Sequence, residues 1–141
     1  MTTGLGRTGK MLACDFEGVK PDVLLLGKSL CGGFLPAAAI LGSKEFTDVI
    51  EFGMHGSSYT ATTLSCVIGE VALNVLVEDG MVKNSAERGD QFLKLLRSLK
   101  SPLIKEVSGR GLLIAVQFEE SDTFKAQDVV EKLVEGGIMV K

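Results

Sequence analysis

Runs of consecutive apolar residues predict two buried strands in the first third of the chain. Val-Leu-Leu-Leu at residues 23–26 ends at a glycine, and a second run at residues 37–41 lies between a proline and a glycine. Short apolar runs with such boundaries are typical of strands that are buried on both faces of a sheet. We therefore expect the two strands to be neighbours, joined by a loop at residues 27–33.

Beyond Thr62 the spacing of apolar residues changes to that of a helix. Apolar side chains recur three or four positions apart, in a stripe that consists of Leu64, Val67, Ile68, Val71, Ala72 and Val75. The pattern predicts one long helix with this stripe facing the core, N-capped by Thr60 or Thr62 and ending near Gly80.

The C-terminal part of the chain alternates between helix and strand patterns. A second helix, which stops at Ser101-Pro102, is predicted by a stripe of Val82, Ala86, Gly89, Leu93 and Leu96. The pattern then predicts a strand at residues 112–118, a helix at residues 124–135 and the beginning of a further strand at residues 138–141. Helices and strands that alternate in this way indicate the α/β class.

A boundary between two structural units is indicated at residues 77–81, where a glycine-rich α/β pattern gives way to a charged amphipathic helix. We expect residues 1–80 and 81–141 to belong to different units. At 141 residues the chain has the size of one domain, and such a chain can bury roughly 68% of its unfolded surface. The length therefore predicts a sizeable core.

Charge and composition exclude several classes of function. The 15 basic and 18 acidic residues are spread along the chain, whereas nucleic-acid binding needs a concentrated basic face. No apolar run approaches the roughly 20 residues that cross a bilayer, and the N-terminus lacks the pattern of a secretory signal, so we expect a cytoplasmic protein. Three widely spaced cysteines and a single histidine predict buried thiols, with neither a metal site nor a disulfide.

The segment GLGRTGKM at residues 4–11 fits two phosphate-binding motifs. Its glycines match G-x-G-x-x-G, and residues 4–10 match G-x-x-x-x-G-K. Both motifs require a strand directly before the first glycine, whereas only three residues precede Gly4, and Met11 stands where a P-loop has serine or threonine. We therefore expect these glycines to make tight turns rather than to bind an anion.

Lys28 is the most informative single residue. It follows the apolar run at residues 23–26, at the carboxyl end of what we expect to be a buried parallel strand, where open α/β sheets keep their ligand crevices. An amine that is partly withdrawn from water there can act as a nucleophile toward a carbonyl. The alternative is a solvated loop charge, the commoner state of a lysine just beyond a strand.

The polar loop His55-Gly-Ser-Ser-Tyr-Thr60 directly precedes the long predicted helix. Its hydroxyls and backbone N–H groups lie where the helix dipole favours an anion such as a phosphate. The alternative is ordinary helix capping, with His55 as a hydrogen-bonded structural residue.

Four motifs follow one another along the chain: GLGRTGK at residues 4–10, VKPDVLLLGKSLCGG at residues 19–33, HGSSY at residues 55–59 and VSGRGLL at residues 107–113. In this order they resemble the class III pyridoxal-phosphate-dependent aminotransferases. Each motif alone is weak, but their joint order is specific and covers nearly the whole chain. The resemblance implies fold type I, with residues 1–80 in the large, mostly parallel-sheet domain and residues 81–141 in the small C-terminal α/β domain.

The resemblance also implies roles for individual residues. Lys28 would form the Schiff base with pyridoxal 5′-phosphate and later move a proton between the substrate carbon and the cofactor. Ser57 and Ser58 match a Ser-Thr pair whose hydroxyl and backbone reach the cofactor phosphate of the neighbouring subunit in a homodimer. The chain departs from the family at Thr60-Ala-Thr-Thr63, where Gly-Gly-Asn-Pro is usual, in the loop that approaches the partner's site.

Within the family the motifs most resemble the ornithine-type members, which implies transfer of the terminal amino group of ornithine to 2-oxoglutarate. Acetylornithine-type and 4-aminobutyrate-type members are the alternatives. The family's aspartate for the ring nitrogen would precede residues 1–3, and its arginine for the substrate carboxylate would follow Lys141, so we interpret the chain as a fragment. A further alternative is therefore a catalytically incompetent product or interaction module. A transit peptide would also lie upstream, which leaves the mitochondrial matrix as an alternative to the cytoplasm.

Overall fold

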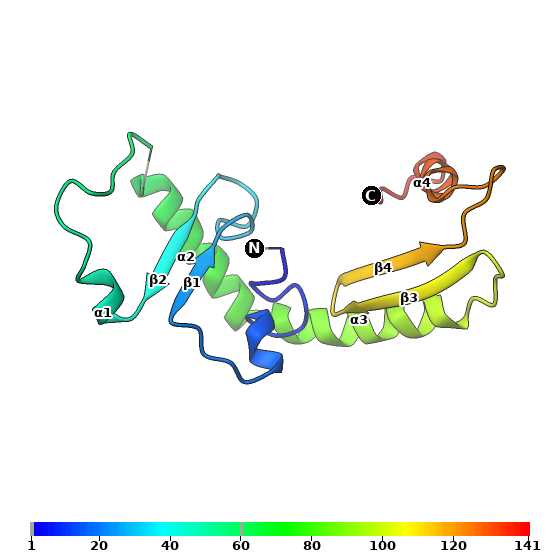
Figure 1. The fold of residues 1–141 in the computed structure, drawn as a ribbon, viewed down its shortest axis with the longest axis horizontal. Helices are drawn as coiled ribbons and strands as arrows, with labels where there is room; N and C mark the ends of the chain where they lie inside the picture. The colour runs from blue at the N-terminus through cyan, green and yellow to red at the C-terminus, as the bar shows by residue number, and fades with distance from the viewer. Residues whose placement is uncertain (1, 60) are drawn as a thin grey trace.

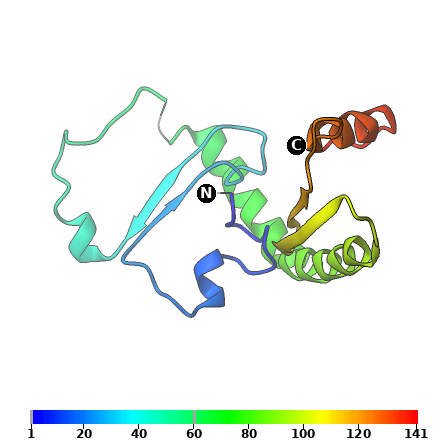
Figure 2. The same cartoon turned by 45° about the vertical axis from the view of Figure 1, so that its right-hand side comes forward.

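The computed structural model describes residues 2–59 and 61–141, arranged as Figure 1 shows. The first half contains a 3₁₀ helix, a hairpin, a short helix and a long helix, namely Ala13–Phe16, β1 (Val23–Leu26), β2 (Ala39–Gly42), α1 (Lys44–Thr47) and α2 (Thr63–Glu78). The second half consists of α3 (Met81–Ser98), β3 (Ile104–Arg110), β4 (Leu113–Phe118) and α4 (Ala126–Glu135). The hairpins lie on opposite sides of the N-terminal segment, β1 and β2 toward α2, and β3 and β4 along α3 (Figure 1, Figure 2).

β1 and β2 form an antiparallel pair in which Val23 lies opposite Gly42. The prediction that these two apolar runs are neighbouring strands is confirmed. The expected burial on both faces is wrong here, because Leu25 is 61% exposed and Ile40, directly opposite, is 58% exposed. The expected parallel pairing is also absent from the part of the chain that the structure describes, where both sheets are antiparallel pairs. With a single neighbouring strand, β1 keeps one open edge.

Local chemistry determines both ends of α2. Thr62 is its N-cap, and the Thr62 Oγ1 accepts a hydrogen bond from the Ser65 amide at 3.3 Å. After Glu78 the chain turns at Gly80, whose φ of 67° is left-handed. The predicted helix and one of its two candidate caps are therefore confirmed, and Thr60 lies outside the described residues.

The face of α2 that packs overlaps the predicted stripe only in part. Of the predicted stripe, four residues are between 42% and 62% exposed, namely Leu64, Val67, Val71 and Val75. The packed face is centred on Gly69, which is buried, and it includes the half-buried Ser65 together with two residues of the predicted stripe, Ile68 and Ala72, which are also half-buried. The prediction was wrong for the four exposed residues because α2 is apolar around much of its circumference, so the hydrophobic period alone does not select a face.

The C-terminal half follows its predicted pattern more closely. On α3 the buried residues are Ser85, Gly89 and Leu93, which lie on the predicted stripe or next to it. β4 and α4 occupy the predicted strand and helix, although α4 begins at Ala126. The pattern did not predict β3, whose sequence is interrupted by Gly109 and which is held by antiparallel pairing with β4.

Residues 138–141 do not form the predicted strand. Instead α4 ends in a Schellman motif, in which the Ile138 amide donates to the Leu133 carbonyl oxygen at 2.8 Å and the Gly137 amide donates to the Val134 carbonyl oxygen at 2.9 Å. Gly137 has the φ of 81° that this closure needs. The apolar tail therefore closes a helix rather than pairing with a strand.

Close backbone approach holds the N-terminal segment against α3 and the β3–β4 turn. The Arg7 carbonyl oxygen accepts hydrogen bonds from the Leu112 amide and from the Ser85 hydroxyl, both at 2.9 Å. A Cβ on Gly89 would overlap the carbonyl oxygen of Gly111. Only residues without side chains permit this spacing, so glycines determine how the segment, helix and turn meet.

The chain exposes far more surface than a compact monomer of its size. Its accessible surface is 10853 Å², whereas a compact monomer of 15.0 kDa exposes roughly 7000 Å². Among the described residues, the buried apolar side chains are Leu5, Cys31 and Leu93. The sizeable core expected from chain length is therefore absent. Within these same residues, we find no helix with the length and apolar character needed to cross a membrane.

Two glycine-to-alanine substitutions test the close packing. Gly89→Ala sets a methyl group against the Gly111 backbone, so we expect the free energy of unfolding to fall by about 1–3 kcal/mol. Gly69→Ala should raise it by about 0.5–1 kcal/mol, because alanine favours a helix interior and its Cβ would lie 3.5 Å from the Cys31 Sγ. Chemical denaturation followed by circular dichroism measures both changes. Similar effects at the two positions would contradict the packing described.

The exposed stripe on α2 predicts that the chain binds a hydrophobic dye. We expect anilinonaphthalene sulfonate fluorescence to rise several-fold with the native chain, and to fall when Val67→Glu and Val71→Lys are combined. The control is the exchange Lys83→Glu with Glu87→Lys, which inverts an exposed ion pair on α3. If the α2 variant keeps its circular dichroism spectrum and its full dye signal, the stripe is not the binding surface.

Candidate functional site

Lys28 lies at the carboxyl end of β1, directly after the buried Gly27. Its φ of 56° is a left-handed conformation, which costs a residue with a Cβ about 1–2 kcal/mol. The side chain is exposed, so the expected partial withdrawal from water is not met in this chain. Within residues 2–59 and 61–141, the Lys28 amine takes part in no ion pair. A strained turn therefore presents an amine that is accessible to a ligand.

The other predicted site residues lie on the loop at residues 51–59, which is exposed throughout. Ser57 Oγ accepts a hydrogen bond from the Tyr59 amide at 3.3 Å, so its hydroxyl proton can still be donated to a ligand. Both views show this loop extending away from the β1–β2 hairpin before the chain enters α2 (Figure 1, Figure 2). The described hydrogen bonds of Ser57 are local, and none of them connects it to Lys28.

A cavity of about 170 Å³ lies beside β1 and was not predicted from the sequence. Three segments line it, at residues 3–5, 12–14 and 24–27. The lining is mostly apolar, with the Thr3 hydroxyl and the Cys14 thiol as its polar side-chain groups. No sequence signal reveals such a cavity, because the three segments meet only in the tertiary structure.

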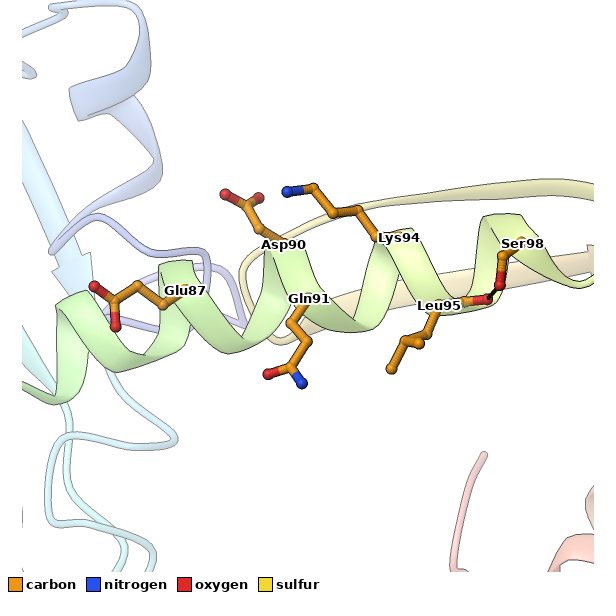
Figure 3. Close-up of a pocket in the computed structure, with 6 residues that line it drawn as sticks. All are labelled: Glu87, Asp90, Gln91, Lys94, Leu95 and Ser98. Atoms are coloured by element: carbon orange, nitrogen blue, oxygen red, sulfur yellow. Dashed lines mark hydrogen bonds between the residues drawn. The ribbon is translucent and has the colours of Figure 1, made fainter.

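A larger hollow, of about 520 Å³, contains none of the predicted site residues. All of its lining comes from α3, namely Glu87, Asp90, Gln91, Lys94, Leu95 and Ser98 (Figure 3). Asp90 and Lys94 point to one side of the helix, whereas Gln91 and Leu95 point to the other. These side chains do not converge on a common point, so the hollow is an open helix surface and not a candidate site.

The glycines of the segment at residues 4–11 make tight turns, as predicted. Gly6 and Gly9 have φ values of 84° and 89°, and the Gly9 amide donates to the Gly6 carbonyl oxygen at 3.0 Å. A Cβ on Gly9 would lie 2.8 Å from the Cβ of Ala86, so α3 occupies the space beside the turn. The element that follows is the 3₁₀ helix Ala13–Phe16 and not an α-helix. The segment therefore lacks the strand-to-helix context of a phosphate-binding loop.

Solved structures that share this fold define a class of protein. An ornithine aminotransferase from Toxoplasma gondii superposes with a TM-score of 0.93 at 44% identity, over 99% of this chain and 33% of that chain. An acetylornithine aminotransferase from Elizabethkingia anophelis superposes with a TM-score of 0.93 at 37% identity, over 99% and 35%. The fold is that of the fold type I pyridoxal-phosphate-dependent aminotransferases, as predicted.

Sequence relatives identify the family. The family model described as aminotransferase class III matches residues 1–141. An ornithine aminotransferase from Brevibacillus brevis is 42% identical over 139 residues, which cover 99% of this chain and 34% of the relative. Ornithine aminotransferase 2 from Staphylococcus aureus is 44% identical over 138 residues, 98% of this chain and 34% of the relative. The chain belongs to the class III aminotransferase family and spans about a third of the length of these curated relatives.

The left-handed backbone at Lys28 predicts that replacing this lysine with asparagine stabilises the fold. Because asparagine tolerates positive φ, Lys28→Asn should raise the free energy of unfolding by about 0.5–1 kcal/mol, whereas Lys28→Val should lower it by about 1 kcal/mol or more. Lys20→Asn is the control, since Lys20 is also exposed and has no positive φ. Urea denaturation of the three variants measures the changes. If the two asparagine variants are equally stable, the strain at Lys28 is not present.

Proposed function

We propose that Lys28 is the residue that binds pyridoxal phosphate in an enzyme that transfers the terminal amino group of ornithine to 2-oxoglutarate. The observation that supports this most directly is an accessible amine on a strained turn at the end of β1, in a chain 42% identical to a protein named ornithine aminotransferase. The related Toxoplasma gondii structure is described with partial occupancy of PLP at its active site.

The residues of this chain fit such a cofactor. The Lys28 amine is exposed and can reach an aldehyde, and Ser57 can donate its hydroxyl proton to a phosphate oxygen. When bound, pyridoxal phosphate supplies an electron sink that weakens bonds to the substrate's amino-bearing carbon. The Lys28 amine, when it is not bonded to the cofactor, would be the base that removes a proton from that carbon and, once protonated, the acid that returns it.

We also propose that Ser57 and Ser58 act in a second subunit rather than beside Lys28 of their own chain. Their loop extends away from the β1–β2 hairpin, and its large side chains are uncovered: Phe52 is fully exposed and Tyr59 is 88% exposed. Exposed aromatic residues of this kind are typical of subunit interfaces. A homodimer would bury them and would bring the two serine hydroxyls to the partner's cofactor phosphate.

The remaining expectations extend the proposal. Residues 1–80 would belong to the large cofactor domain and residues 81–141 to the small domain. The acetylornithine-type alternative has support from the Elizabethkingia anophelis structure, which shares the fold at 37% identity. The alternative that this chain by itself is catalytically incompetent is supported by its accessible surface of 10853 Å². A chain this open does not enclose a reacting centre, and an enzyme normally excludes water from that centre.

Absorbance spectroscopy tests the role of Lys28. The purified 141-residue chain mixed with pyridoxal phosphate should develop the near-visible band of a lysine bonded to the cofactor aldehyde, and Lys28→Ala should lose most of it. Lys20→Ala, which removes another exposed lysine, should keep the band. Equal spectra for the native chain and Lys28→Ala would refute specific binding at Lys28.

A chimaera tests whether this chain supports amino transfer when the rest of a full-length enzyme is present. Residues 1–141 would replace the matched third of the Brevibacillus brevis relative, which supplies the rest of a full-length enzyme. We expect ornithine-dependent amino transfer by the chimaera and none by the chain alone. A chimaera that folds and transfers amino groups only from acetylornithine would instead favour that alternative substrate.

A further inference from the structure

The turn that carries Lys28 is attached to α2 through one buried thiol. Cys31 is 1% exposed, and its Sγ–H donates to the Ser65 carbonyl oxygen at 3.3 Å. Cys31 follows Lys28 by three residues, so this bond ties the loop to the helix close to the reactive lysine. The exposed Cys66 is the next residue along α2 from the acceptor, yet it takes no part in this contact.

Small residues on α2 make this attachment possible. Ser65, Gly69 and Ala72 are four and three positions apart, so they share one face of the helix. A Cβ on Gly69 would lie 3.5 Å from Cys31 Sγ, and a Cβ on Gly32 would lie 3.5 Å from the Ala72 Cβ. The loop therefore lies close to the helix, with space at Gly69 and Gly32 for about one methyl group at ordinary van der Waals distance.

The same loop holds Lys28 in an unfavourable conformation. Lys28 has a φ of 56°, and after three intervening residues Gly32 and Gly33 again have positive φ values, of 61° and 87°. A turn at residues 29–32 directly follows Lys28, and it is closed by the Gly32 amide, which donates to the Ser29 carbonyl oxygen at 3.0 Å. A non-glycine residue persists in this region only where its surroundings hold it there. Cys31, three residues beyond Lys28, is the residue of this loop that is almost fully buried and hydrogen-bonded to α2.

We infer that Cys31 is a positioning residue, which acts through the loop to keep the Lys28 amine aimed at its ligand. This inference rests on the proposed function of Lys28. The Cys31 thiol acts without touching the cofactor, because it restrains the backbone that determines where Nζ lies. A small displacement of a reacting group can slow a reaction by orders of magnitude, so a weak bond at this position has a measurable consequence.

The test uses the 141-residue chain with Cys31→Ala, Cys31→Ser and the matched control Cys66→Ala. We expect Cys31→Ala to slow appearance of the Lys28-dependent absorbance band about tenfold and to speed hydrogen exchange of the Gly32 and Phe34 amides. Cys31→Ser should stay within about twofold of the native rate, because its hydroxyl can donate to the same carbonyl. Cys66→Ala should leave both measurements unchanged.

Each outcome decides between the two proposals. If the native chain shows no Lys28-dependent band, the proposed function fails and this inference fails with it. If the band forms normally and Cys31→Ala matches Cys66→Ala in rate and exchange, only the positioning role is overturned. If Cys31→Ala does not fold, Cys31→Ser decides: a folded serine variant with a slow band would overturn the role of the hydrogen bond, and a native rate would support it.

Discussion

The carbonyl oxygen of Arg7 accepts hydrogen bonds from two elements at once, the Ser85 hydroxyl on α3 and the Leu112 amide at the β3–β4 turn. This shared acceptor can form only because the three backbones approach within the distance that Gly89 and Gly111 allow. A side chain at Gly89 would push α3 away from the turn, and one at Gly111 would push the turn away from the backbone of residues 7–9, so either would leave the Arg7 carbonyl with fewer partners.

Neighbouring contacts reinforce the same junction. Side chains on both sides of Gly6 close around it, because a Cβ there would lie 3.3 Å from Val82 on α3 and 3.4 Å from Leu76 on α2. The Arg110 guanidinium lies 4.4 Å from the centroid of the Phe16 ring, a cation–π contact between the end of β3 and the 3₁₀ helix. The N-terminal segment therefore links both hairpins to the pair of long helices, although it contains no long element of its own.

α2 has one face that packs against the rest of the chain and another apolar face that is exposed. Its small-residue face receives the loop that carries Lys28, through contacts at Ser65 and Gly69. Its larger apolar residues, such as Leu64 and Val67, remain 62% and 53% exposed. A helix of this composition is normally covered all round. The arrangement agrees with a family whose full-length members are about three times as long as this chain, since further protein surface is needed to cover the open face.

Local properties of the sequence were sufficient to predict β1 and β2, the cap at Thr62 and the packed stripe on α3. The order of the motifs was sufficient to predict the family. They also indicated Lys28, whose role stays a prediction. Only the tertiary structure decided which face of α2 packs and why the glycines of residues 4–11 are needed. The hydrophobic period shows which positions of a helix are apolar. It does not show which distant segment of the backbone packs against them. Close approach favours the smallest residues, and these carry almost no hydrophobic signal.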